Sequence, residues 1–192
     1  MYLFFDTETT GLPKNWKAPV TDVDNWPRLV QLAWITFNKD GVRQSAGSDI
    51  VKPKGFTIPE AASKIHGITD VIAHEKGKNL SAVLDNIYYQ ITQATILVGH
   101  NIAFDNKILG AEIIRKGCYP KIKPPRIKIC TMFSSTKFCN IPGLYGLKWP
   151  SLTELHNKLF GREFEGAHDA TFDIEATAKC FWELVRLGII VC

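Results

Sequence analysis

Tyr2-Leu3-Phe4-Phe5-Asp6-Thr7-Glu8, near the N-terminus, joins a run of apolar residues to two acidic ones. The run predicts a buried central strand over residues 2–6, followed by a turn rich in threonine and glycine. Alternate residues of a strand project from the same face, so the carboxylates of Asp6 and Glu8 should lie side by side. Their repulsion, about 4 kcal/mol at contact in a medium of intermediate polarity, would be offset by a cation. The stretch indicates a metal site, although an exposed acidic turn would read the same way.

Strands and helices follow in a regular order. We expect further strands at residues 29–37, 45–51, 96–99 and 127–131, and helices at 59–65, 80–92, 104–116, 151–160 and 170–187. Asp40-Gly41 signals a turn between the second and third strands, which makes the start of the sheet antiparallel. The later strands alternate with helices. The predicted fold class is therefore α/β, with a central mixed five-stranded sheet flanked by helices.

Length and composition fit one ordinary globular domain over residues 1–192, with 45% hydrophobic and 22% charged residues. The net charge of +4 permits a polyanionic partner without requiring one. Residues 116–128, KGCYPKIKPPRIK, carry five cations and no anion. They suit a phosphate-binding patch if they lie beside the active cleft, or otherwise a solvated loop.

The cysteines and the N-terminus bear on where the protein works. Its five cysteines are odd in number and include no C-x-x-C pair, which argues against a disulfide framework and a thiolate zinc site. The chain opens without a basic leader, and no apolar stretch approaches the ~20 residues of a membrane span. We expect a cytoplasmic protein with no membrane contact.

A third acid, Asp105, ends the segment His100-Asn101-Ile102-Ala103-Phe104-Asp105, between a predicted buried strand and a helix. From the first turn of that helix, Asp105 could point into the same cleft as Asp6 and Glu8. It could equally complement the positive end of the helix dipole. His100 is expected to be a structural histidine with hydrogen-bonded ring nitrogens.

His168 and Asp173 stand five residues apart in the segment that opens the last predicted helix. Five residues turn through about 500°, so the two side chains could not share one helical face. If Asp169 caps the helix, His168 falls in the preceding loop and can swing over the site, while Asp173 stays fixed on the helix. A loop histidine and an exposed helical acid are the alternative.

These segments together resemble the DEDDh (DnaQ-like) 3′-5′ exonuclease superfamily, typified by the proofreading subunit of bacterial DNA polymerase III, ribonuclease T and oligoribonuclease. The resemblance covers nearly the whole chain. It implies a ribonuclease H-like fold and two divalent cations, Mg²⁺ or Mn²⁺, held by Asp6, Glu8, Asp105 and Asp173. It also implies that His168 acts as general base and that nucleoside 5′-monophosphates leave from a 3′ end. Turnover should then rise as the imidazole loses its proton.

Other matched positions imply contacts with the terminal nucleotide. They are Thr9, Leu12, His66, Asn101 and Phe104, and His66 lies in the family-like segment over residues 64–69. Leu12 and Phe104 could instead be core residues. The stretch between Gly11 and Leu29 is longer than the minimal family loop, and its Trp16 and Trp26 could stack on a base or belong to the local core.

The resemblance leaves several alternatives open. The favoured substrate is single-stranded or frayed DNA, the alternative is the 3′ end of RNA, and a non-catalytic nucleic-acid-binding module is the third possibility. The sequence stops 19 residues after Asp173, without the polymerase-holding tail of the proofreading subunit, which argues against polymerase association. Nothing in the sequence specifies the oligomeric state.

Overall fold

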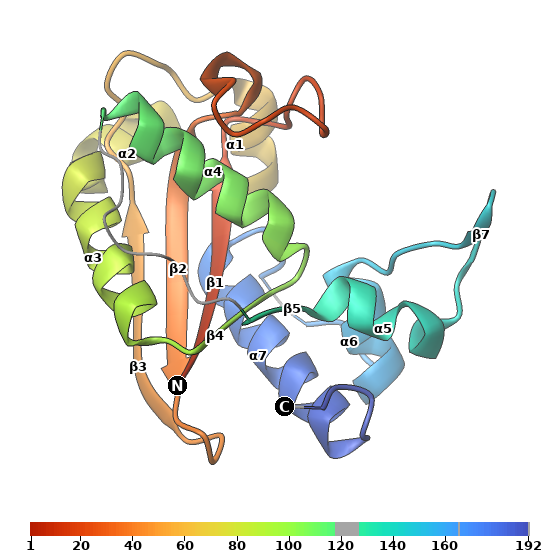
Figure 1. Ribbon diagram of the computed structural model, residues 1–192. Helices are drawn as coiled ribbons and strands as arrows, with labels where there is room; N and C mark the ends of the chain where they lie inside the picture. Colours follow the sequence, from red (N-terminus) through yellow and green to blue (C-terminus); the bar gives the residue numbers. More distant parts are fainter. Residues whose placement is uncertain (118–126, 165, 192) are drawn as a thin grey trace.

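A mixed five-stranded sheet forms the centre of the computed structural model, which describes residues 1–117, 127–164 and 166–191 (Figure 1). The strand order is β3-β2-β1-β4-β5. The bounds are β1 (Tyr2–Thr9), β2 (Leu29–Phe37), β3 (Arg43–Ile50), β4 (Ile96–Gly99) and β5 (Ile127–Cys130). β1, β2 and β3 pair antiparallel, and β4 and β5 run parallel to β1. The predicted α/β fold class and mixed sheet are confirmed.

Seven α-helices surround the sheet in the described part of the chain. They are α1 (Glu60–His66), α2 (Asp70–Lys76), α3 (Leu80–Gln93), α4 (Ile102–Arg115), α5 (Thr131–Cys139), α6 (Leu152–Phe160) and α7 (Ala170–Arg186). A 3₁₀ turn, η1 (Val23–Asn25), lies in the loop after β1, and a small hairpin, β6 (Pro142–Gly143) and β7 (Gly146–Leu147), follows α5. None of the described helices has the length and apolarity needed to span a membrane.

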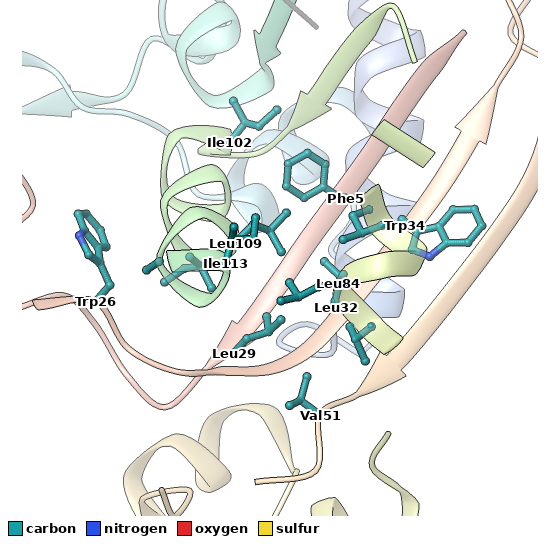
Figure 2. Close-up of a cluster of buried hydrophobic side chains, with 14 of the residues drawn as sticks. Phe5, Trp26, Leu29, Leu32, Trp34, Val51, Leu84, Ile102, Leu109 and Ile113 are labelled. Carbon is teal, nitrogen blue, oxygen red and sulfur yellow. The ribbon is translucent and has the colours of Figure 1, made fainter. Parts of the chain in front are cut away.

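Alternation along β1 divides the core between the two faces of the sheet. Leu3 and Phe5 pack in a cluster with residues of α3 and α4 (Figure 2), whereas Phe4 packs with residues of α7 such as Phe181 on the other face. Since side chains alternate along a strand, Asp6 and Glu8 continue the Phe4 side and face α7. Thr7 continues the Phe5 side and faces α4.

Most predicted elements are confirmed to within one or two residues. β2 and β4 have the predicted bounds. The Asp40-Gly41 turn forms, with Gly41 at a φ of 76°. Ser151 and Glu154 form the reciprocal capping box expected at the start of α6.

The predicted end of β1 is wrong by three residues, and that of β5 differs by one. β1 extends to Thr9, so Asp6 and Glu8 lie inside the strand and not where a turn begins. Pairing with β2 continues through Glu8 opposite Gln31, and an irregularity in register comes only between Glu8 and Thr9. Similarly, β5 ends at Cys130, because the next residue already starts α5.

Sequence patterns missed α2, α5 and the β6–β7 hairpin. The α5 segment, TMFSSTKFC, is made mostly of residues with low helix propensity, so its helix depends on tertiary packing. Of the basic segment, residues 118–126 lie outside the described residues, and so the predicted phosphate patch stays a prediction.

Candidate active site

Three of the four predicted acids converge at one place. Asp6 and Glu8 come from β1 and Asp173 from the first turn of α7, and each offers a carboxylate oxygen within 4.8 Å of the others. This grouping follows from the fold, because Asp6 and Glu8 face the side of the sheet on which α7 packs. Oxygen-only ligand sets of this kind suit hard divalent cations.

Asp105 lies in the first turn of α4 and is only 3% exposed. The Thr7 hydroxyl donates a hydrogen bond of 2.7 Å to Asp105 Oδ1. Thr7 lies between Asp6 and Glu8 in the sequence of β1, so the strand that carries these two acids also holds Asp105 in place. Asp105 is not one of the three grouped carboxylates. It is nevertheless close enough to raise the pKa values of both Asp6 and Glu8 by charge repulsion.

Burial raises the pKa of every acid in the set, and repulsion between the acids adds to this rise at Asp6 and Glu8. Burial is the largest cause at Asp6, followed by repulsion from Asp105, Asp173 and Glu8, and it lifts this pKa well above the ordinary value. Burial, with repulsion from Asp173 and Asp105, raises the pKa of Glu8 to about 8. Burial raises the pKa of Asp105 to about 7, although the hydrogen bond from Thr7 lowers this pKa. Burial also raises the pKa of Asp173 to about 6.

The part of the chain that the structure describes provides no lysine or arginine partner for these acids. Among the residues that the structure describes, none of the four carboxylates forms an ion pair with lysine or arginine. Close carboxylates without such a partner are stabilised by bound cations, so the residues present fit a divalent metal site. The charge of two divalent ions would equal that of the four ionised acids.

His168 lies directly before α7, exposed to solvent, with its backbone in the left-handed region at a φ of 70°. Its backbone N–H donates to Asp173 Oδ2 at 3.2 Å. Asp169 is the N-cap, as the sequence predicted, and its side chain accepts from the Thr171 N–H. The imidazole is therefore carried by a loop whose backbone is fastened to one of the acids.

Gln31, a residue that the sequence analysis missed, fastens this loop to the sheet. It lies opposite Glu8 on β2 and is buried. Its amide donates to Asp169 Oδ1 at 3.2 Å, and its carbonyl accepts from the Ala170 N–H at 3.3 Å. The only available signal was one polar residue within the apolar run of β2.

The residues predicted to contact substrate lie around the end of β1 and the start of α4. Thr9 is buried, and its hydroxyl donates to the Gly11 carbonyl at 2.7 Å. His66 is buried, and its Nδ1 accepts from the Ile68 N–H at 3.1 Å, while its Nε2 has no hydrogen-bond partner among the described residues. Burial lowers the pKa of His66, and the backbone of Thr9 beside the ring partly offsets this effect.

The remaining predicted contacts differ in exposure. Leu12 is 74% exposed, which rules out the core role considered for it, and Phe104 is partly buried. Asn101 caps α4 in the left-handed conformation, which asparagine tolerates. Trp16 is 52% exposed, and its ring centroid lies 5.6 Å from that of Phe104. Trp26 is 3% exposed and belongs to the core, so of these two tryptophans Trp16 alone presents its ring to solvent.

His100 is a structural residue, as expected. Its Nδ1 lies 3.0 Å from the Thr131 hydroxyl and its Nε2 lies 3.0 Å from the Pro150 carbonyl. Burial lowers its pKa to about 4. The ring links β4 to α5 and α6, and both of its nitrogens are engaged.

Comparisons with known proteins agree with this site. Residues 3–181 match the family model described as exonuclease (RNase T). The DNA polymerase III epsilon subunit of Treponema pallidum is 33% identical over 109 residues, which are 57% of this chain and 44% of the relative. The PolC-type DNA polymerase III of Streptococcus mutans is 31% identical over 187 residues, 96% of this chain and 11% of the relative. The chain thus spans less than half the length of these relatives.

Solved structures share the fold. An Escherichia coli exonuclease I complex with single-stranded DNA superposes with a TM-score of 0.75 at 24% identity, covering 97% of this chain and 40% of that one. Exonuclease X, in complex with 5′-overhanging duplex DNA, superposes with a TM-score of 0.61 at 23% identity, covering 98% of this chain and 93% of that one. With the matching family model and the ordered acidic segments, these findings show that the chain belongs to the RNase T exonuclease family, of the DnaQ-like DEDDh type.

Proposed function

We propose that this protein is a metal-dependent 3′-5′ exonuclease that shortens DNA from single-stranded or frayed 3′ ends and releases nucleoside 5′-monophosphates. The observation that carries the proposal is the convergence of Asp6, Glu8 and Asp173, with the exposed His168 beside them. Family membership supports the reaction type. The polymerase III relatives and the DNA complexes among the structural neighbours favour DNA over RNA.

The four carboxylates of Asp6, Glu8, Asp105 and Asp173 would hold two divalent cations, Mg²⁺ or Mn²⁺. Such ions supply positive charge to the scissile phosphate and to the oxygens that attack it and leave it. Asp6 and Glu8 are fixed by β1, and Asp173 by a capped helix, so these three ligands need little reorganisation. Thr7 orients Asp105 through its hydroxyl.

His168 takes the proton of the attacking water on a ring nitrogen in this proposal. Its position supports the role, because the loop leaves the imidazole in solvent while the backbone is held at Asp173. A side chain that is not built into the core can move between the water and bulk solvent. A neutral imidazole can accept a proton.

The terminal nucleotide would lie across the end of β1 and the start of α4. Leu12 and the Trp16–Phe104 ring pair offer apolar surface for a base, and base–aromatic stacking is worth about 1–3 kcal/mol. Thr9, His66 and Asn101 would contact the sugar or the phosphate. The unpartnered Nε2 of buried His66 supports a ligand contact, because buried ring nitrogens are usually hydrogen-bonded.

Digestion of end-labelled oligonucleotides tests the function. Single-stranded DNA and RNA of one sequence, each with a free or a blocked 3′ end, are incubated with Mg²⁺, Mn²⁺ or a chelator. We expect 5′-labelled DNA to give a ladder of shorter products, no reaction with blocked ends, and none with chelator. Faster RNA digestion would reassign the substrate, and binding without turnover under any condition would leave a non-catalytic module.

Two further proposals concern context. We propose that the protein works in the cytoplasm, which the free thiols of Cys130, Cys139 and Cys180 support. We also propose that the folded unit over residues 1–192 is a single exonuclease domain. Association with a polymerase is not part of the proposal.

A further inference from the structure

A pocket of about 730 Å³ lies outside the acidic site and is lined by basic side chains. Among its described lining residues, five are cationic and none is acidic: Arg28, Lys52, Lys54, Arg115 and Lys116. The pocket wall also includes Phe56, together with the N-cap and the first residue of α3, Asn79 and Leu80. The positive end of the α3 dipole is thus added to the cationic side chains.

Two of the cations are fixed by a fully buried carboxylate. Glu112 is 0% exposed, and its Oε1 accepts from Arg28 Nε and from Arg115 Nη1, each at 2.8 Å. The Arg28 guanidinium also lies over the Phe56 ring, 4.1 Å from its centroid. The single negative charge of Glu112 is shared by two guanidinium groups, so the cluster keeps a net positive charge. The same hydrogen bonds hold both arginine side chains in place.

Lys52 and Lys54 are the mobile cations of the pocket. Both are exposed, and within the described ranges neither forms a salt bridge. They flank Pro53 in the segment after β3. The net positive charge of the guanidinium pair beside two exposed ammonium groups suits the phosphates of a nucleic-acid strand.

The pocket opens at the same edge of the sheet as the acids. Thr9 pairs with Leu29, and the Arg28 N–H donates to the Thr10 hydroxyl at 2.9 Å. Arg28 therefore lies on the strand next to β1, beside the end of β1. The pairing of Gln31 with Ile50 brings the end of β3, and hence Lys52 and Lys54, to that edge as well. The pocket is lined from the face of the sheet that α3 and α4 cover, whereas Asp6 and Glu8 face α7. Asp105 at the start of α4 and Arg115 at its end are ten residues apart, or about 15 Å along the helix axis, so the pocket lies several nucleotides from the acidic site.

We infer that this pocket binds the phosphodiester backbone of the substrate strand on the 5′ side of the nucleotide being removed. The inference rests on the proposed function and adds a second contact region to it. A short oligomer held at its 3′ end would not reach the pocket, whereas a longer strand would engage both. The pocket then contributes to affinity for long strands and to the salt dependence of that affinity.

Binding of fluorescent DNA in chelator, measured by anisotropy, tests the inference without requiring turnover. The variant Lys52→Glu with Lys54→Glu is compared with wild type on single strands of roughly 2 and 20 nucleotides. We expect about 10-fold or more weaker binding of the long strand, little change for the short one, and a log–log salt slope shallower by about 1.4, for two lost phosphate contacts on a single strand.

A matched control changes the same charge elsewhere. Lys39→Glu with Lys137→Glu alters two exposed lysines that do not line the pocket, one of them in the turn at the far end of β2. We expect this control to bind the long strand within about 2-fold of wild type. Equal losses in the two variants, or no loss in the pocket variant, would overturn the inference.

The binding test of the pocket can succeed or fail independently of the exonuclease proposal. If wild type degrades no oligonucleotide with Mg²⁺ or Mn²⁺, the exonuclease proposal fails, while the binding comparison still reports on the pocket. If wild type is active and both variants bind alike, only the pocket assignment is lost. Melting curves of all the variants verify that the substituted proteins remain folded.

Discussion

Two regions of this molecule hold carboxylates in opposite surroundings. Glu112, on α4, is fully buried and accepts hydrogen bonds from two guanidiniums and from the Leu29 N–H. Among the described residues, Asp6 and Glu8, on β1, form no ion pair with a lysine or arginine, and burial and repulsion from other acids raise their pKa values. The Glu112 region is complete within the protein, whereas the acidic site requires positive charge from outside.

This difference separates structural charge from functional charge. A carboxylate that is fully paired by its own chain holds elements together, here β2 to α4. A cluster of carboxylates that repel each other lowers the stability of the folded protein, and it is retained where it binds something. Substitutions in the two regions should therefore have opposite effects on stability and activity.

The largest effect is expected for Asp6→Asn. Loss of one ligand should reduce turnover by about 10³-fold or more, since even changes outside the first ligand shell cost 10–100-fold. In chelator at pH 8 the same variant should melt higher than wild type, because a buried and repelled charge has been removed. Turnover assays and melting curves measure both. A lower melting temperature without metal would contradict the assignment of Asp6 as an uncompensated charge.

Replacing His168 should reduce activity and leave the charge of the acidic site intact. We expect turnover to fall by about 10²–10⁴-fold, the usual contribution of a general base. His168→Asn is the cleaner variant than His168→Ala, because asparagine tolerates the left-handed backbone at this position. Mn²⁺ binding followed by calorimetry should stay within a few-fold of wild type. Near-normal turnover would remove His168 from the mechanism.

Glu112→Gln should reduce stability by about 3 kcal/mol, since it leaves two partly buried guanidiniums without their anion. This corresponds to about 6–12 °C in melting temperature for a domain of this size. The control is Glu175→Gln, which breaks the exposed pair with Arg43 and should cost at most about 1 kcal/mol. Equal losses in the two variants would show that the buried cluster contributes no more than a surface pair.

The pH dependence of the metal-free protein gives a smaller effect. A carboxyl whose pKa is raised on folding contributes stability that is present below its unfolded pKa and is lost as pH rises through the folded value. The folded pKa values of about 8 at Glu8 and about 7 at Asp105, against ordinary values of about 4, put this loss between about pH 4 and pH 8.

Metal should suppress that loss. From pH 7 to 8.5 the chelated protein should lose several degrees of melting temperature. His66 and His100, whose pKa values are lowered, would oppose this loss of stability only below that range. With saturating Mn²⁺ the decrease should largely disappear, because the acids are then ionised at both pH values. Parallel pH curves with and without metal would argue against the acids as its ligands.

Much of the fold was predictable from local patterns. Apolar runs gave β2 and β4 their bounds, and cap residues located α6 and α7, because these signals act within a few residues of the chain. The elements that were missed, such as α5, have weak local propensity and form through contacts with distant segments. The extension of β1 to Thr9 likewise depends on a partner strand that lies some twenty residues away in sequence.

For the site, the sequence by itself determined which residues are proposed to carry the chemistry: two acids in alternation on one strand, an acid opening a helix, and a histidine just before a capped helix. Only the tertiary structure decided that Asp6, Glu8 and Asp173 meet within 4.8 Å, that Thr7 holds Asp105, and that Gln31 fastens the His168 loop. It also decided that Trp26 is core while Trp16 faces solvent. The reason is physical: identity and spacing fix what a side chain can do, whereas distance and burial follow from the packing of segments far apart in the chain.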